Sequence, residues 1–402
     1  MKKYFIIAAA AFMAIAACTK VDTFETKVDA PISFSVINHL HQTRATAGLT
    51  YPTDVPFGSF AWWTENDWTG AAADQDFVFM DNQKVQYYAA TQSEAAKWAP
   101  TSTYYWTKSG KLTFASYSPY VDDNTKASKG FSAIPVYNAA TGFNFADYSI
   151  VADTNVDLMY ANLAANCTQD TNVNGGDVTD SSNPEGGFKG VPTIFNHALC
   201  QLGFEFRAIG NKNPNVTKIE IDLTDVDIMN IDNKGSFIQL PATETTPRWT
   251  TNHATDKTDY EYAPSATITL PLIEANATNI PKTDNYTALG RTRILMPQAL
   301  VVTKDAENKP LDIALTTVTD QKLVVKYTIK TEYASKPGEW ATEDVTSIVR
   351  LNNGSIAAWK ENQNITYRIS INPYATLPIT FDPAVVSWTD VYSDNIDIIP
   401  GN

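Results

Sequence analysis

The feature that most constrains this chain is a two-residue alternation of apolar and polar side chains, repeated in short runs. Residues 32–36 read Ile-Ser-Phe-Ser-Val, as expected for a β-strand that buries one face. Helical periodicity is confined to residues 93–98 and 356–361, each long enough for a turn or two. Further alternating runs, separated by clusters of Gly, Pro, Asn and Asp, occupy residues 112–117, 202–206, 218–223, 266–270, 323–329 and 366–371. This pattern predicts an all-β chain of the sandwich type.

The length and composition of the chain suffice for two folded domains. It has 402 residues, of which 44% are hydrophobic and 11% aromatic, enough to build hydrophobic cores. Residues 174–190 contain several glycines, Pro184 and almost no apolar side chain, which is typical of a linker. We therefore expect an N-terminal domain over residues 45–190 and a C-terminal domain over residues 191–402. A long loop within a single domain is the alternative interpretation of the same stretch.

The first residues have the pattern of a bacterial lipoprotein signal. Lys2 and Lys3 precede an apolar stretch over residues 4–17, which ends in Ala-Ala just before Cys18. The stretch is shorter than the roughly 20 residues with which a helix spans a bilayer. We expect residues 1–17 to be removed and Cys18 to carry several acyl chains, because one chain alone anchors a protein only marginally. An ordinary signal peptide followed by a chance cysteine is the alternative.

The net charge limits the partners that can be expected, and the number of cysteines limits the disulfides. The formal net charge of −14 would repel nucleic-acid phosphates and anionic lipid head groups, so neither is expected as a partner. Such a charge suits an exposed surface protein. Apart from Cys18, only Cys167 and Cys200 are present, too few for a disulfide scaffold. Whether these two cysteines pair depends on their geometry.

No pattern of catalytic or cofactor-binding residues is recognisable. The sequence has no HExxH, no GxSxG and no phosphate-binding glycine loop. A glycosidase-like carboxylate pair has no specificity among 44 acidic residues. His39 and His41 lack a cysteine or acidic neighbour that would complete a metal site, and His197 is interpreted as a structural histidine. We therefore expect neither enzymatic activity nor a cofactor.

A single arginine follows the first alternating strand. Arg44, next to Ala45, is the only arginine before Arg207 and lies in the polar run 38–48. Exposed polar loops are where proteolysis concentrates. An arginine-specific protease that cuts after Arg44 would release residues 18–44, a propeptide that carries both the lipid anchor and the first strand.

A series of short motifs runs along almost the whole chain. They are the lipobox ending at Cys18, Arg44-Ala45, residues 157–161 (DLMYA), 195–199 (FNHAL), 294–298 (ILMPQ), Trp359 with residues 362–369 (NQNITYRI), and 379–383 (ITFDP) with Val386 and Trp388. In this order they resemble the fimbrillins of the Bacteroidales, the type V pilin family. Each motif alone is degenerate, whereas their order over nearly the full length is considerably more specific.

The resemblance implies two transthyretin-like β-sandwich domains and assembly by strand exchange. In that family a lipoprotein precursor travels to the outer membrane, where an arginine-specific surface protease removes the first strand. Carried over to this chain, the displaced strand contains Ile32, Phe34 and Val36, and the cut separates Arg44 from Ala45.

The resemblance also implies a donor strand in the C-terminal tail. It lies either in residues 385–388, with Val386 and Trp388, or in residues 396–399, with Ile396 and Ile398. The expected partners are copies of this chain and other fimbrial subunits, and the expected product is a stalk-like, adhesive fimbria on the cell surface.

Two alternatives stay open at this point. Trp62, Trp63, Trp68 and the Tyr-Tyr-Trp run at residues 104–106 would suit a lipid-anchored glycan-binding protein, although core packing is the more common role of such residues. A tip or anchor subunit of a fimbria is the other alternative, because an anchor keeps its lipidated N-terminus. Arg44 and the apolar tail favour the stalk.

Overall fold

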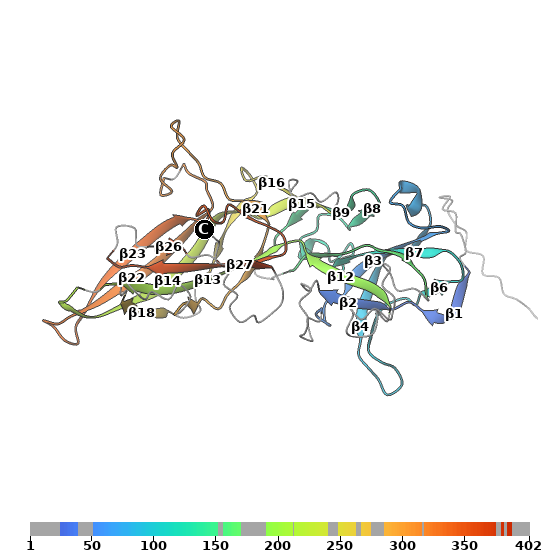
Figure 1. Cartoon of the computed structure of the whole chain (residues 1–402), viewed down its shortest axis with the longest axis horizontal. Helices are drawn as coiled ribbons and strands as arrows, with labels where there is room; N and C mark the ends of the chain where they lie inside the picture. Colours follow the sequence, from blue (N-terminus) through green and yellow to red (C-terminus); the bar gives the residue numbers. More distant parts are fainter. Residues whose placement is uncertain are drawn as a thin grey trace, which may run out of the picture.

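Regular structure in this chain is β-strand almost throughout, which confirms the predicted all-β class. The computed structural model describes residues 25–38, 51–151, 156–169, 190–211, 213–239, 248–262, 267–274, 285–315, 317–374, 379–381 and 384–387. Within these ranges the only helical elements are two short 3-10 helices, η1 (Ala72–Gln75) and η2 (Ala127–Lys129). The strands form two lobes placed end to end, with a smaller sheet near their junction (Figure 1). That each lobe is transthyretin-like stays a prediction.

The first lobe is a β-sheet that closes on itself. Its strands are β2 (Phe34–Asn38), β3 (Phe57–Thr64), β4 (Val78–Tyr88), β5 (Lys97–Pro100), β7 (Lys111–Ser118), β10 (Met159–Ala161), β11 (Ala164–Cys167) and β12 (Val191–His197). They follow the order β10-β12-β2-β5-β4-β3-β7-β11, and β10 also pairs with β7. The strands from β10 to β7 therefore form a ring. Beside it, β1 (Thr26–Pro31) pairs with β6 (Tyr105–Thr107).

Both faces of the ring are buried along β3 and β7. In β7, Leu112 and Phe114 belong to a core inside the ring, to which every ring strand contributes. Ala115 and Tyr117 belong to a second core on the outside. Because successive side chains of a strand point to opposite faces, this division shows that the outer face of these strands is covered by another layer.

That layer is the small sheet near the junction of the lobes. Its strands are β8 (Val136–Asn138), β9 (Gly142–Ser149), β15 (Lys234–Ile238) and β16 (Trp249–Thr251), in the order β16-β15-β9-β8. Phe143, Phe237 and Trp249 pack with side chains of β3 and β7. The sheet thus joins segments from both sides of the domain boundary expected at residue 190, and β12, just after it, lies in the first lobe. The division at that residue stays a prediction.

The second lobe contains the largest sheet. Its strands are β13 (Cys200–Gly210), β14 (Val216–Asp232), β17 (Lys257–Glu261), β18 (Ile268–Glu274), β19 (Thr287–Ala288), β20 (Arg293–Leu295), β22 (Lys322–Tyr333), β23 (Trp340–Arg350), β25 (Gln363–Ile371), β26 (Ile379–Phe381) and β27 (Ala384–Ser387). The main path is β23-β22-β14-β18-β13-β25-β26. A separate pair joins β21 (Gln298–Ala299) to β24 (Ala358–Trp359). Phe204, Phe206 and Tyr367 lie in the core of this lobe.

The alternating runs predicted the strands well, and the helical periodicity did not predict helices. Residues 112–117, 202–206, 218–223, 323–329 and 366–371 lie wholly within β7, β13, β14, β22 and β25. The two predicted helical turns are wrong, because Trp98 lies in β5 and Trp359 lies in β24. Both indoles are buried in the lobe cores, and the free energy of burying an aromatic side chain exceeds a weak local preference for helix.

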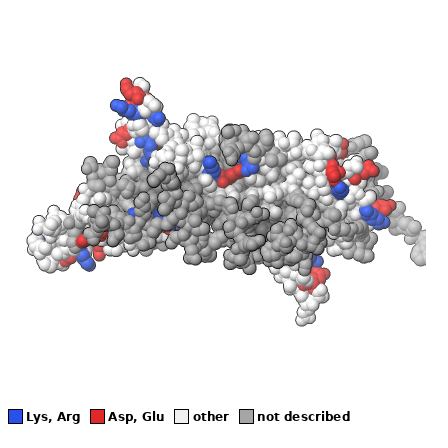
Figure 2. All heavy atoms as spheres, viewed as in Figure 1, with Lys and Arg blue, Asp and Glu red and all other residues white. Residues whose placement is uncertain are grey.

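Charged side chains form small mixed groups on the surface. On the face drawn in Figure 2, basic and acidic side chains of the described residues lie next to one another in several places.

The small sheet should stabilise both lobes. Phe237 in β15 is fully buried, and its ring centroid lies 5.5 Å from Phe145, 5.2 Å from Tyr160 and 5.3 Å from Trp249. We expect Phe237→Ala to lower the free energy of unfolding by about 3–5 kcal/mol, measured by urea denaturation followed through tryptophan fluorescence. Val136→Ala, at a side chain 66% exposed in the same sheet, should change it by less than about 0.5 kcal/mol. Equal losses would contradict this role of the sheet.

Candidate functional site

The strand predicted to be displaced lies inside the ring rather than at an edge. β2 pairs in parallel with β12 over five residue pairs, from Phe34–Val191 to Asn38–Phe195. On its other side it pairs with β5 through Phe34 and Trp98. Loss of β2 would leave unpaired backbone groups on both neighbours and would open the ring between them.

The side chains of this strand fill the core of the ring. Ile32 is 2% exposed and Phe34 is 3% exposed, while Val36 packs against the same core. The Phe34 ring lies edge-on to Phe57 at 5.5 Å and to Phe114 at 5.7 Å, a geometry that the aromatic quadrupole favours. The structure thus brings together the three residues that the alternation singled out. Their displacement stays a prediction.

The strand starts two residues later than the alternation indicated. β2 begins at Phe34, whereas Ile32 lies between β1 and β2 and donates its backbone N–H to Tyr104 O at 2.8 Å. Upstream, β1 is held by β6, and Lys108 N donates to Glu25 O at 2.8 Å. Two strands, β1 and β2, therefore hold the segment before the predicted cut. Sequence analysis predicted β2 but not β1.

A glycine at the start of β12 permits the close approach of the first strand. Val191 N donates to Ser33 O at 2.8 Å. Gly190 has a φ of +133°, and a Cβ atom at this position would lie 2.6 Å from Ser33 O. A side chain here would both strain the backbone and push β12 away from β2. Sequence analysis assigned Gly190 only to a linker, because nothing near it in the sequence reveals its neighbour.

The chain is anchored in the same core on both sides of the predicted cleavage site. Arg44 and Ala45 themselves, like Cys18, lie outside the described residues. After them, Tyr51 is 2% exposed, and its ring lies 4.9 Å from that of Phe195 and 5.2 Å from that of Trp98. Its hydroxyl shares a hydrogen bond of 2.5 Å with Ser118 Oγ. A cut between β2 and Tyr51 would break the covalent link between them, while Tyr51 has contacts of its own in the core.

One of the two predicted donor runs is already paired within its own lobe. β26 and β27 both lie antiparallel to β25, and Val386 faces Asn364 in this register. Up to Ser387, residues 385–388 therefore complete the sheet of the second lobe. Trp388, Ile396 and Ile398 lie outside the described residues.

The tryptophans that would suit a sugar-stacking platform are packed in the protein. Trp62 is 4% exposed, and its ring lies 6.1 Å from that of Phe60 and 5.4 Å from that of Tyr137. Trp68 packs against the same core, and Trp63 donates its indole N–H to Ser109 O at 2.8 Å. Because a stacked sugar needs an exposed ring face, the structure favours core packing for Trp62.

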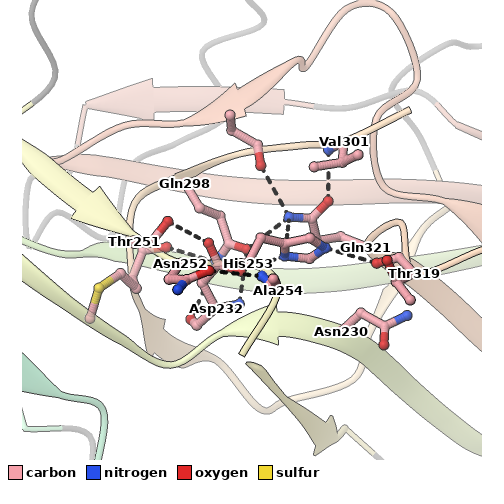
Figure 3. Close-up of polar contacts among 12 residues, drawn as sticks. Asn230, Asp232, Thr251, Asn252, His253, Ala254, Gln298, Val301, Thr319 and Gln321 are labelled. Carbon is pink, nitrogen blue, oxygen red and sulfur yellow. Dashed lines mark hydrogen bonds and ion pairs between the residues drawn. The ribbon is translucent and has the colours of Figure 1, made fainter. Parts of the chain in front are cut away.

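A cluster of polar side chains surrounds an aspartate–histidine pair (Figure 3). Asp232, at the end of β14, is 1% exposed and lies 2.5 Å from His253 Nδ1 and 2.5 Å from the Thr251 hydroxyl, which donates to it. His253 Nε2 lies 2.8 Å from Thr319 O. Both ring nitrogens face oxygen atoms of the protein, whereas a catalytic dyad keeps Nε2 for a nucleophile. This pair is therefore structural.

Two glutamine side chains extend the cluster between segments of the second lobe. Gln298 Oε1 accepts hydrogen bonds from Asp232 N at 3.0 Å and from Gln321 Nε2 at 3.1 Å. Gln321 Nε2 also donates to Ala299 O at 3.0 Å, and Gln321 Oε1 accepts from Val301 N at 2.7 Å. These bonds join the end of β14 to β21 and to the segment before β22, as the dashed lines of Figure 3 show.

The other histidines and the cysteines have no arrangement for chemistry where the structure describes them. His197 is buried, and its Nδ1 lies 2.7 Å from Asp157 Oδ2, in keeping with a structural histidine, while His39 and His41 lie outside the described ranges. Cys167 and Cys200 are both free and belong to different cores. Burial raises the pKa of both thiols, which keeps them in the unreactive protonated form.

Groups that could hold a metal ion, and helices that could span a membrane, were sought in the part of the chain that the structure describes. No group of three or more His, Cys, Asp or Glu side chains is placed there to hold a metal ion. No helix among those residues is long and apolar enough to cross a bilayer.

The comparisons with known proteins concern nearly the whole chain. A family model described as fimbrillin-like matches residues 43–388. No curated protein matches the sequence significantly. A crystal structure of a fimbrial protein from Bacteroides vulgatus is similar with 17% identity and a TM-score of 0.53, covering 89% of this chain and 99% of that one. At this identity the likeness is one of fold.

Two further solved structures are more distantly similar. A candidate cell adhesion protein from Bacteroides uniformis has 13% identity and a TM-score of 0.41, covering 90% of this chain and 100% of that one. The tip fimbrial protein Mfa3 from Porphyromonas gingivalis has 14% identity and a TM-score of 0.30, covering 83% of this chain and 94% of that one.

The seating of β2 in the ring can be tested by truncating its central side chain. In the precursor, Phe34→Ala should lower the free energy of unfolding by about 3–5 kcal/mol, because it leaves a cavity between Phe57 and Phe114. Ser35→Ala, on the opposite face of the same strand, should change it by less than about 0.5 kcal/mol. Urea denaturation of the two variants measures the difference, and similar values would show that β2 is not held by this core.

A buried ion pair beside the polar cluster predicts how stability depends on pH. The Asp320 carboxylate, with no exposed surface, lies 2.6 Å from Arg350 Nε and accepts from Thr303 N at 3.0 Å. Burial alone would raise the pKa of Asp320, yet the hydrogen bonds of Thr303 and Arg350 hold it below its ordinary value. Because the folded pKa is lowered, the carboxylate stabilises the fold above the unfolded pKa, about 3.9, and this contribution is lost as the pH falls through the folded value.

Asp320→Asn should therefore lower the free energy of unfolding at pH 7, by up to about 3–5 kcal/mol, because it leaves Arg350 without its charged partner. The deficit relative to the native protein should shrink below about pH 4. Urea denaturation between pH 7 and pH 3 measures both effects. Asp123→Asn, at a carboxylate 80% exposed and paired with Lys126, is the matched control and should have little effect at either pH. A deficit that stays constant with pH would contradict this assignment.

Proposed function

This chain belongs to the fimbrillin-like family, and on that premise we propose that it is a stalk-like structural subunit of a fimbria. The family consists of fimbrial and cell adhesion proteins, which act at the cell surface. The observation that carries the proposal is the position of β2. It is the first ring strand in the chain, its side chains fill the core of the first lobe, and the predicted cleavage site follows it in the sequence.

The proposed precursor is an outer-membrane lipoprotein that carries acyl chains on Cys18. An arginine-specific surface protease cuts between Arg44 and Ala45 and separates residues 18–44 from the rest. Those residues include both β1 and β2, so the cut removes the lipid anchor and frees the strand that closes the ring. Tyr51, which remains, keeps the new N-terminal segment in the core.

Departure of the strand creates a binding groove. Burying a side chain such as Ile32 or Phe34 contributes about 1.5–3 kcal/mol, so the two vacated positions offer roughly 3–6 kcal/mol to a strand that refills them, before the cost of ordering that strand. The open edges of β12 and β5 add backbone hydrogen bonds, as in other cases of strand addition.

We assign the donor strand to residues 396–399 of a neighbouring subunit. Residues 385–387 already pair with β25 and are not available without opening their own sheet. Ile396 and Ile398 are separated by Asp397, and alternate residues of a strand share a face. The two isoleucines therefore have the same spacing as Ile32 and Phe34.

The protease acts as the switch in this proposal. Before cleavage the tethered strand occupies the groove at high effective concentration, which prevents a second chain from binding. After cleavage each subunit has one groove and one free tail. Such contacts join two different surfaces of identical subunits. When the rotation from one subunit to the next does not close into a ring, repeated contacts produce an open filament.

The proposal predicts the behaviour of the purified precursor. Incubation with an arginine-specific protease should give a ladder of oligomers on native gels, with Ala45 as the new N-terminus by Edman sequencing. The sequencing is needed because Arg291 also lies on the exposed surface. Arg44→Ala should keep the protein monomeric, since β2 then stays tethered.

A tail variant separates cleavage from assembly. Deletion of residues 389–402 should leave cleavage at Arg44 intact and abolish the ladder, because the groove is open and no donor is present. The matched control is a deletion of 400–402 alone, which keeps Ile396 and Ile398 and should assemble. Oligomers formed without the tail, or persistent monomers after complete cleavage of the native chain, would overturn the proposal. Surface protein that retains acylated Cys18 would indicate an anchor subunit instead.

A further inference from the structure

The outermost strand of the second lobe has one free edge. β23 stands at the end of the main path of the largest sheet and pairs only with β22 among the described strands. It has 11 residues, whereas strands usually have about five or six. With β22 it forms the hairpin that reaches the end of this lobe farthest from the first lobe (Figure 1). A long row of backbone N–H and C=O groups therefore points away from the sheet.

The first half of this strand is open on both faces. Residues 341–344 are all exposed, and successive side chains of a strand point to opposite faces. An approaching strand therefore meets no layer above or below this half. In the other half, Val345 and Val349 pack against the core of the lobe, which fixes the strand on the sheet.

β23 lacks most of the features by which proteins protect a sheet edge. Such edges are usually short, bent by a bulge, interrupted by proline or covered by another segment. β23 contains no proline, and its pairing with β22 runs over its whole length without a shift of register. The charges of Glu343 and Asp344, near its middle, are the remaining protection. These charges do not exclude a partner strand, but they limit how it can lie.

A second copy of β23 fits this edge in one antiparallel register. When Val345 of one copy lies opposite Val345 of the other, all 11 residues are paired, because Val345 is the middle residue of the strand. Glu343 then faces Ser347, and Asp344 faces Thr346, whose hydroxyl can donate to the carboxylate. Registers centred on Glu343 or Asp344, or between them, set carboxylates directly opposite each other, which is destabilising. The register with the most pairs is therefore also one that keeps the acidic residues apart.

The other pairs of this register join residues that favour strands. Thr342 faces Ile348 on the outer face of the sheet, and the two copies of Val345 meet at the centre. Threonine, isoleucine and valine are β-branched and pack well across neighbouring strands. The sequence of β23 is thus complementary to itself in charge and in shape, which selects a copy of the same chain as the partner.

We propose that β23 is an interface between two copies of this chain, which pair through their free edges around a two-fold axis at Val345. The contact uses the same surface on both copies, so it closes after two subunits and differs from the head-to-tail strand exchange. β23 lies after the predicted cleavage site, so the precursor and the cleaved protein both carry the interface. In a fimbria it joins two filaments side by side, and in the precursor it gives a dimer whether or not strand exchange takes place.

Cysteine cross-linking tests the register. The background is the full mature-length precursor, residues 18–402, with Cys18→Ser, in which the two remaining native cysteines are buried. Val345→Cys should form a disulfide-linked dimer under mild oxidation, because the two thiols meet at the axis. Thr342→Cys is the matched control, since this register separates its two copies by six positions along the strand, about 20 Å. We expect at least tenfold more covalent dimer from Val345→Cys on non-reducing gels.

A charge at position 346 tests the contact without a cross-link. Thr346→Asp should weaken dimerisation about threefold to tenfold, because it places a carboxylate opposite Asp344 of the second copy, and Thr346→Lys should strengthen it by a similar factor. Within one chain Thr346 pairs with Lys326, so the same substitutions should shift the thermal unfolding midpoint of the dilute monomer in the opposite directions. Analytical ultracentrifugation of the precursor, at micromolar to sub-millimolar concentrations, measures the dimer constant.

Several results would overturn the inference. They are a precursor that stays monomeric over this concentration range, equal cross-linking at positions 345 and 342, or the same dimer constant for the two Thr346 variants. The thermal unfolding midpoint of each variant establishes that it is folded, and the Thr346 variants decide if Val345→Cys does not fold. Because the precursor is uncleaved throughout, none of these results bears on the proposed strand exchange.

Discussion

The parallel pairing of β2 with β12 is the contact on which the first lobe depends. It joins the start of the described chain to a strand that comes more than 150 residues later, and with the contact to β5 it closes the ring around Phe34. β2 is also the first strand of that ring along the sequence. A single cut after it would separate it, together with β1, from the rest of the chain, whereas a strand from the middle of the chain would need two cuts. The topology therefore makes this one strand removable without loss of any other connection.

The second constraint is the small sheet that covers the outer face of the ring. β8 and β9 come from the first half of the chain, and β15 and β16 come from the second half. Because their aromatic side chains share one core with β3 and β7, the two lobes are tied together by packing as well as by the connecting segments. Arg248, paired with side chains of both lobes, adds a polar clamp beside that core. These contacts fix the two lobes to each other at the junction.

The sequence predicted the strands and their inward faces, because a period of two is a local property. Residues 32–36 show this clearly, since Ile32 and Phe34 are buried where the alternation placed them. It did not predict which strands are neighbours. Alternation gives the faces of a strand, whereas the pairing of β2 with β12 depends on residues far apart, so Gly190 was assigned only to a linker. Likewise nothing near Tyr117 reveals that Phe143 covers it, and the polar side chains around Arg248 come from four separate segments.

In the proposed exchange, the groove left by β2 would select a strand by its side-chain spacing as well as by its backbone hydrogen bonds. Parallel pairing is slightly less stable per residue than antiparallel pairing. The longer contact of β2, with β12, is parallel. Its antiparallel contact with β5 consists of the single pair Phe34 and Trp98. The side chains of this strand are buried in the core, with Phe34 enclosed by Phe57 and Phe114. A strand that presents two apolar residues separated by one polar residue satisfies the same positions. The tail of this chain has that pattern at Ile396 and Ile398. In the proposed exchange, the covalent tether through Arg44 gives the first strand its advantage over that tail.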